Sequence, residues 1–545
     1  MDPADRAYTQ HVLARLTDYC MTEGLPWTRR LWDVGSTLAL EELWEAGVWQ
    51  TQKVLSPAAV SWQRAELRRL VGPDLGLGDQ ELRREVNQLL TTGDLTDPSP
   101  SHRRLRHLID HARSGYLQRW ARALRDGKTV KPERLARTLA SHLLDLGYTA
   151  PYLATHWVTE LRRAAPNAVD IVESAATLAD APETTFEVVL AFDTIPHASV
   201  AAQTDGWITN AEISRWLGTS GFSSSGIRTG GGFRYHITAR DPFGAANMVR
   251  QMFERMVARS QFIRKDRGGL TALPHLWVAG HPDPLPVTGP ARSADILSLT
   301  KTGRLYDVNL GRTPIDDALE LAAPVNQAGG APGPAVAGAW AAVESLLSHP
   351  GDPVDDNERG GKAVAADRLA AIVACSWPRA ELTTLIHRHK ANDELARLRD
   401  ECTTNYSRAR LLAEQIATSG PGCLDFRGRP TRHSDAAAAE RMKDMLDEPR
   451  RVLREVKQAV QIALRRLYRA RNVVLHGGST SSIALESTLR TAAPLVGAGL
   501  DRIAQHYFDA AMSPLDLAAR AELAIDIVDG ETALSVVDLL QKPGA

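Results

Sequence analysis

Three residues near the end of a long basic segment have the side-chain types that cleavage of an RNA phosphodiester requires. Arg471, Asn472 and His476 lie within six consecutive positions. On a helix, Asn472 and His476 share one face because they are four residues apart, and the long side chain of Arg471 reaches toward the same phosphate. An imidazole can exchange a proton with a 2′-hydroxyl or a leaving 5′-oxygen at neutral pH. A guanidinium holds a phosphate and stabilises the charge that builds on its oxygens, and an amide orients either group.

A long amphipathic helix is expected to position these three residues. Apolar residues recur at steps of three and four through 449–476, as on a helix that faces a core. The segment also holds eight Lys/Arg and one acidic residue, and Gly477 and Gly478 follow it, where a helix would end. Its basic face is expected to contact a phosphate backbone. The residues predicted to bind RNA there are Arg465, Arg466 and Arg469.

The end of this helix resembles the HEPN superfamily, whose ribonuclease members carry an R-x4-6-H motif, commonly with Asn, Asp or His directly after the arginine. The matching residues are Arg471, Asn472, His476 and Gly477, and the resemblance covers about 363–545. It implies a helical bundle in which Arg471 and His476 are catalytic and Asn472 supports them. It also implies RNA cleavage without a metal or other cofactor, 2′,3′-cyclic phosphate ends, and a homodimer that forms one composite site. HEPN members serve in anti-phage defence, abortive infection and toxin–antitoxin systems, so a phage-derived trigger or an antitoxin is an expected partner.

The spacing of arginine and histidine is weak evidence when taken alone. Arg106/His111 and Arg137/His142 have the same spacing as Arg471/His476. The first of these pairs lies in 101–137, which holds eleven Lys/Arg and three acidic residues. A second, degenerate HEPN domain within 1–180 is therefore an open alternative to a solvated basic face. We attribute the Arg137/His142 match to chance.

A second class of function is also compatible with the sequence. HEPN domains serve in other proteins as non-catalytic docking or ligand-binding modules beside a nucleotidyltransferase. Arg471 and His476 would then be structural, and 183–320 would bind the ligand. That region lacks the Gly-Ser and paired-carboxylate signature of a nucleotidyltransferase.

The sequence patterns on either side of the motif predict a multidomain, mostly α-helical chain. Residues 1–180 show helical periodicity, and 183–320 alternate strand and helix patterns, which indicates a small central α/β domain. Residues 321–362 are rich in Pro and Gly and are expected to form a linker with a short helix, and 363–545 are helical again. The expected strands are 184–192, 231–241, 274–280 and 303–310, and the expected C-terminal helices are 363–375, 379–418, 435–447, 449–476, 481–510 and 513–541.

Composition excludes several classes of protein. The chain has 545 residues, of which 43% are hydrophobic and 24% charged, as in ordinary globular proteins. Its four cysteines are far apart and form no CxxC pair, so no disulfide framework, cysteine metal site or other metal site is expected. The longest uncharged run, between Glu320 and Glu344, contains Pro and Gly and indicates no membrane span. With no signal-peptide pattern at the N-terminus, we expect a cytoplasmic protein.

Overall fold

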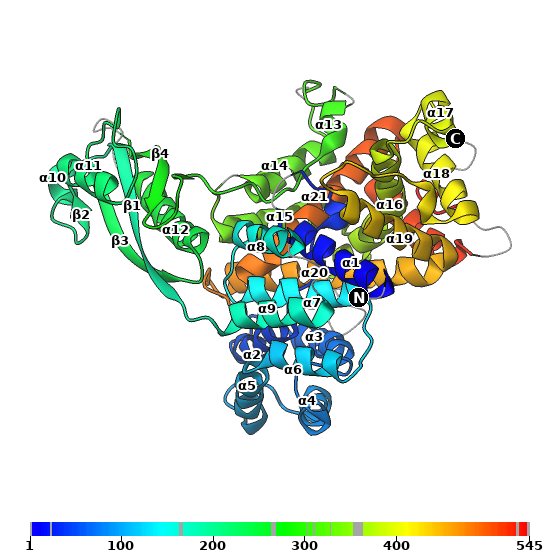
Figure 1. The fold of residues 1–545 in the computed structure, drawn as a ribbon, viewed down its shortest axis with the longest axis horizontal. Coiled ribbons are helices and arrows are strands. Elements are labelled where there is room, and N and C mark those ends of the chain that lie inside the picture. The colour runs from blue at the N-terminus through cyan, green and yellow to red at the C-terminus, as the bar shows by residue number, and fades with distance from the viewer. Residues whose placement is uncertain are drawn as a thin grey trace.

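The computed structural model describes residues 3–21, 24–162, 167–262, 269–301, 303–308, 311–327, 329–352, 363–529 and 534–541. The chain is mostly helical and carries one small antiparallel sheet. The sheet lobe projects to one side, and the N-terminal helices pack against the C-terminal ones in the remainder (Figure 1). This architecture confirms the predicted fold class of a mostly α-helical chain with a small central mixed region.

The N-terminal region is helical throughout its described part. Two of its helices begin with a Ser N-cap followed by Pro, since Ser56 and Ser99 accept hydrogen bonds from backbone amides of the first turn. The elements are α1 (Pro3–Cys20), η1 (Trp27–Arg29), α2 (Ser36–Thr51), α3 (Pro57–Val71), α4 (Gln80–Thr92), α5 (Pro100–Arg113), α6 (Tyr116–Arg125), α7 (Pro132–Asp145), α8 (Ala150–Arg162) and α9 (Ala168–Asp180).

The central sheet has the strand order β2-β3-β1-β4-β5, and every pairing is antiparallel. Alternate residues of its long central strand face two different cores. Val188 and Leu190 pack toward the core beneath α12, and Val189 and Ala191 pack toward the core beneath α11. The elements are β1 (Thr184–Thr194), α10 (Ala198–Ala201), β2 (Trp207–Ile208), α11 (Asn210–Thr219), β3 (Gly232–Ala239), α12 (Pro242–Ser260), β4 (Thr271–Val278) and β5 (Leu285–Pro286).

The strand predicted at 303–310 is wrong over 303–308, its described part, which forms turns after the short helix α13 (Leu297–Lys301). The predicted linker also needs correction. Residues 314–326 and 332–347 form helices α14 (Pro314–Asn326) and α15 (Pro332–Leu347), which pack against each other. Trp340 of α15 is fully buried in the C-terminal core. The sequence predicts one short helix here, and the structure has more helix because these small residues allow close packing.

The C-terminal region is a helical bundle. The break expected between 375 and 379 is absent, because α16 continues through Pro378. The helix expected over 379–418 is instead interrupted after 388 and after 401, whereas the helix expected over 449–476 has those bounds in the structure. The elements are α16 (Val364–Arg388), α17 (Glu394–Glu401), α18 (Asn405–Ser419), η4 (Pro421–Cys423), α19 (Arg432–Asp447), α20 (Pro449–His476), α21 (Leu485–Ala510) and α22 (Pro514–Ile527).

Helix α16 is long and apolar enough to cross a membrane by length and composition. Most of that apolar stretch is buried against other helices of the bundle. Its hydrophobicity is therefore accounted for by its position in the core.

The N-terminal helices and the C-terminal bundle share an extensive interface. Val473 of α20 belongs to the N-terminal core, and Trp27 and Trp62 pack against the C-terminal core. Arg29 is fully buried between the two regions and bonds to Glu381 of α16 and Asp435 of α19. The first 180 residues are thus bound directly to the bundle that carries the motif.

A buried histidine in this N-terminal region should make the fold sensitive to mild acid. His142 of α7 is 2% exposed and stacks on Tyr116. Burial, together with Arg113 and Arg119, lowers the pKa of His142 to about 3. An unfolded histidine has a pKa near 6.5, so between these values the unfolded chain binds a proton that the folded chain does not.

We therefore expect the stability of the wild type to fall as the pH drops below about 6.5, by about 1.4 kcal/mol per pH unit from this group. Urea denaturation at pH 7 and pH 5.5 measures the effect. His142→Phe should flatten the dependence, because it removes the titrating group and keeps an aromatic ring against Tyr116. An equal pH dependence in both proteins would contradict this assignment.

Candidate active site

Helix α20 ends at the predicted motif, and its end is fixed by the two glycines that follow. The backbone amide of Gly477 donates to the carbonyl of Asn472, 3.3 Å away. Gly478 has a φ of +62°, a left-handed conformation that favours glycine at a helix end. A Cβ on Gly477 would lie 2.6 Å from the carbonyl of Val473 and 3.0 Å from the ring of Trp49. The turn after His476 is therefore closely packed against α2.

The structure brings the three predicted catalytic residues together. Nη1 of Arg471 donates to Oδ1 of Asn472 at 3.0 Å and to Nε2 of His476 at 3.1 Å. Asn472 is buried, Arg471 is half-buried and His476 is exposed. The amide thus anchors the guanidinium from the core side, while the imidazole lies at the surface.

The hydrogen bond between Arg471 and His476 has a fixed direction. A guanidinium has donors only, so Nε2 of His476 is the acceptor of this bond.

An acidic residue from α15 lies beside this group. Oε2 of Glu344 is 4.0 Å from Nη2 of Arg471 and accepts a hydrogen bond from Nε1 of Trp340 at 3.0 Å. The ring of Trp340 packs in turn against Tyr468 of α20, with centroids 4.9 Å apart. The helix that the sequence had assigned to a linker thus contributes a carboxylate to the surroundings of Arg471.

The arginines predicted to bind RNA are placed differently from that prediction. Arg466 and Arg469 are 3% and 4% exposed, and both bond to Glu42 of α2, at 2.8 and 3.2 Å. Arg465 pairs with Asp367 of α16 at 2.8 Å. Arg466 and Arg469 therefore join α20 to the N-terminal helices and do not present a surface to a polyanion in this conformation.

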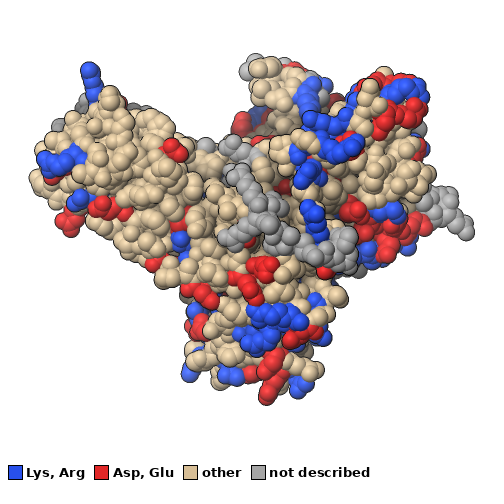
Figure 2. Space-filling model, viewed as in Figure 1, with Lys and Arg blue, Asp and Glu red and all other residues tan. Residues whose placement is uncertain are grey.

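Acidic residues also pair with the basic side chains near the N-terminal end of α20. Arg450 and Arg454 pair with Asp529 and Asp526 at the end of the chain's last described helix. On the face shown in Figure 2, positive and negative side chains are interspersed over the helical part of the molecule. The positive charge of 449–476 is thus largely paired with acidic residues of the same chain.

The pKa values of Glu42 and of a second acidic residue in the N-terminal helices shift in opposite directions, although the arginines lower both. Burial opposes ionisation of Glu42, but Arg466 and Arg469 outweigh it and lower its pKa. For Glu66 burial dominates and the pKa is raised. Nothing in the sequence marked Glu42, Glu66 or Glu344 as neighbours of α20, because each is more than a hundred residues away from its partner.

The other two pairs with the same spacing do not reproduce the arrangement. Arg106 bonds to Glu41 and Asp110 and lies over the ring of Trp44, and no contact with His111 is found among the described residues. His142 is buried against Tyr116, as described above. Of the three pairs, the described contacts join arginine to histidine only at α20.

Two exposed apolar side chains flank the candidate site. Leu475 is 52% exposed and Ile483 is 41% exposed. Within the described residues, no group of three or more His, Cys, Asp or Glu side chains is arranged to hold a metal ion. No family model, curated protein or solved structure matches the chain.

Proposed function

We propose that the protein is an endoribonuclease of the HEPN superfamily that acts without a metal or other cofactor. The observation that carries the proposal is the hydrogen bonding of Arg471 to both Asn472 and His476 at the exposed end of α20. The catalytic residues are Arg471 and His476, with Asn472 as a positioning residue. Residues 363–545 form the HEPN domain.

The proposed reaction is a transesterification followed by release of the product. The 2′-oxygen of the RNA attacks the adjacent phosphorus, and its proton passes to Nε2 of His476. Arg471 binds the phosphate oxygens while the bond from phosphorus to the 5′-oxygen breaks. The leaving 5′-oxygen takes a proton from the corresponding histidine of a second copy, and the other product ends in a 2′,3′-cyclic phosphate.

Purified protein should therefore cleave total RNA in the presence of EDTA and leave cyclic phosphate ends. We propose that such cleavage serves bacterial defence or acts as a toxin in the cytoplasm, under control by the N-terminal regions and a phage-derived trigger or an antitoxin. End-group analysis of the products by mass spectrometry tests the chemistry. Products with 3′-hydroxyl ends would contradict the mechanism.

We also propose a homodimer that pairs two motifs. Leu475 and Ile483 expose apolar surface beside His476, as expected of a face that meets a second copy. Light scattering should give about twice the 59.4 kDa mass of one chain. Leu475→Asp should yield monomers and lose cleavage. A wild-type monomer at micromolar concentration, both alone and with RNA, would exclude the dimer.

The alternative is a non-catalytic HEPN module. It is favoured by the ion pairs of Arg466 and Arg469, which give the basic face of α20 a structural role. In that case α20 would only fix the N-terminal helices to the bundle. RNA cleavage that is lost in His476→Ala excludes this alternative.

A further inference from the structure

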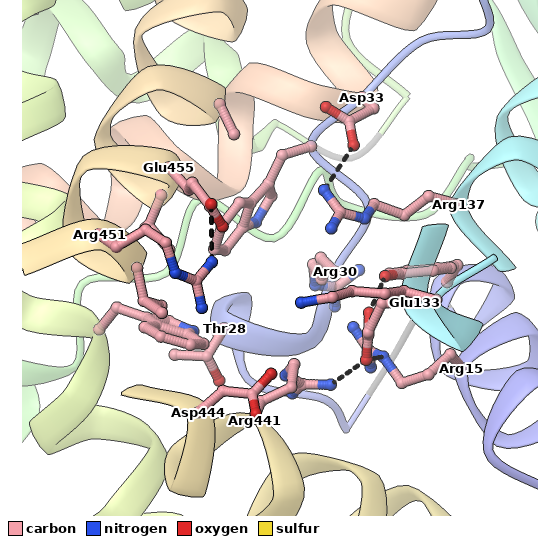
Figure 3. A pocket seen from close by; sticks show the side chains of 17 residues that line it. Arg15, Thr28, Arg30, Asp33, Glu133, Arg137, Arg441, Asp444, Arg451 and Glu455 are labelled. Atoms are coloured by element: carbon pink, nitrogen blue, oxygen red, sulfur yellow. Dashed lines mark hydrogen bonds and ion pairs between the residues drawn. The ribbon is translucent and has the colours of Figure 1, made fainter. Parts of the chain in front are cut away.

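A cavity of about 180 Å³ lies between the N-terminal helices and the C-terminal bundle, away from His476. One side is formed by α1, the segment that follows η1, and α7, and the other by α16, α19 and α20. Figure 3 shows Arg137, Glu133 and Arg15 on one side of this space, and Arg451 and Glu455 on the other. Both parts of the chain therefore line the cavity.

The walls combine aromatic and apolar surface. Tyr19, Trp32 and Trp377 line the cavity, and α20 adds Val452 and Val456. Trp377 is 4% exposed, and its Nε1 has no acceptor among the described residues. That nitrogen is buried inside the wall, so the rings are the surface that the cavity offers to a planar ligand.

The lining also carries an excess of cations. It contains six Lys/Arg and four Asp/Glu. Several of these residues neutralise one another, since Arg441 and Arg15 pair with Glu133, and Arg451 pairs with Glu455. Lys131 is exposed at the start of α7, and no hydrogen bond or ion pair of its side chain is found among the described residues. Its ammonium is therefore available to an anion.

The volume of the cavity limits the size of a ligand. An enclosed apolar cavity of about 150 Å³ holds one benzene-sized ring, so about 180 Å³ holds a planar ring system and little more. A larger polar group attached to that ring would stay outside, where Lys131 is exposed. An ammonium group at such a position binds phosphate.

We propose that this cavity binds a nucleotide. Its base enters between the aromatic walls, and its phosphate is held by Lys131. Aromatic side chains stack on nucleobases. The binding site is independent of the proposed ribonuclease activity.

The geometry also couples this site to α20. Residues 451–459 of α20 line the cavity and His476 ends the same helix, so the two are separated by about 26–38 Å along one rigid element. The N-terminal helices contact the C-terminal half of α20, since Glu42 pairs with Arg466, and the turn beyond the motif, since Glu45 accepts from Ser482. A nucleotide that bridges the two regions should therefore stabilise their interface, and any effect on RNA cleavage rests on the function proposed above.

Isothermal titration calorimetry of the full chain with AMP, GMP, CMP and UMP tests the proposal. At least one nucleotide should bind with a Kd below about 1 mM, its nucleoside should bind at least about tenfold more weakly, and inorganic phosphate should show no saturable heat. Lys131→Glu should weaken binding at least about tenfold. Lys128→Glu, an exposed lysine outside the cavity on the same connection, is the matched control and should bind like the wild type.

Trp32→Leu removes one aromatic wall of the cavity, so we expect affinity to fall about fivefold to tenfold while the protein stays folded by circular dichroism. Absence of heat with all four nucleotides overturns the proposal. So does unchanged binding in Lys131→Glu, or equal binding of nucleotide and inorganic phosphate. Nucleotide binding by a protein that cleaves no RNA would refute the ribonuclease and leave this site standing.

Discussion

Replacing His476 with alanine is expected to lower EDTA-resistant RNA cleavage by at least about 100-fold, the usual contribution of a group that transfers a proton in the transition state. The reason is the position of its imidazole. Nε2 of His476 is the acceptor of the hydrogen bond from Arg471, at the exposed end of α20. Since the side chain is exposed, its removal should leave the fold intact, and the thermal unfolding temperature should match that of the wild type.

The chain supplies its own matched control for this substitution. His111 follows Arg106 with the same spacing and is also exposed, but Arg106 is held by Glu41 and Asp110. His111→Ala should therefore cleave RNA at the wild-type rate. Rates are measured on one fluorescent RNA under single-turnover conditions in EDTA.

Arg471→Lys tests the role of the planar guanidinium. Lysine keeps the positive charge but loses the planar group that bonds to Asn472 and His476 together. We expect a loss of at least about tenfold. Equal cleavage by the wild type, His476→Ala and Arg471→Lys would show that the activity arises elsewhere, either in the protein or from a contaminant.

Replacing Arg29 with alanine is expected to lower the free energy of unfolding by about 3–5 kcal/mol, because it deprives two buried carboxylates of one of their partners. Nε of Arg29 bonds to Glu381 at 2.8 Å, and its Nη1 bonds to Asp435 at 2.7 Å. All three side chains are fully buried. Burial opposes ionisation of Glu381, but Arg29 and Arg441 outweigh it and lower its pKa to about 2.

The measurement is calorimetric unfolding at a fixed scan rate and neutral pH. Arg104→Ala is the matched control, because Arg104 makes a two-point contact with Glu85 at the surface, and exposed pairs contribute at most about 1 kcal/mol. An Arg29→Ala protein as stable as Arg104→Ala would contradict the structural role of this network. Arg29→Ala should also expose the interface between the N-terminal helices and the bundle to limited proteolysis.

Helices whose bounds depend on neighbouring residues could be predicted without the structure. The bounds of α20, its apolar face and its end at two glycines follow from periodicity and from the conformational freedom of glycine, so 449–476 could be predicted. The spacing of Asn472 and His476 on one face is likewise a property of a single helix. The hydrogen bonds of Arg471 to both residues agree with that prediction.

Only the tertiary structure decided which charges face water. Arg465, Arg466 and Arg469 read as a surface for RNA because basic residues are usually solvated, but Asp367 and Glu42 pair with them from distant parts of the chain. No local pattern encodes a partner more than four hundred residues away, as Glu42 is from Arg466. The helix predicted within 321–362 is longer than expected for a related reason, since small residues favour a loop by composition and a close-packed helix only when a neighbouring surface accepts them. Burial and charge pairing depend on which segments meet, and that is a property of the whole fold.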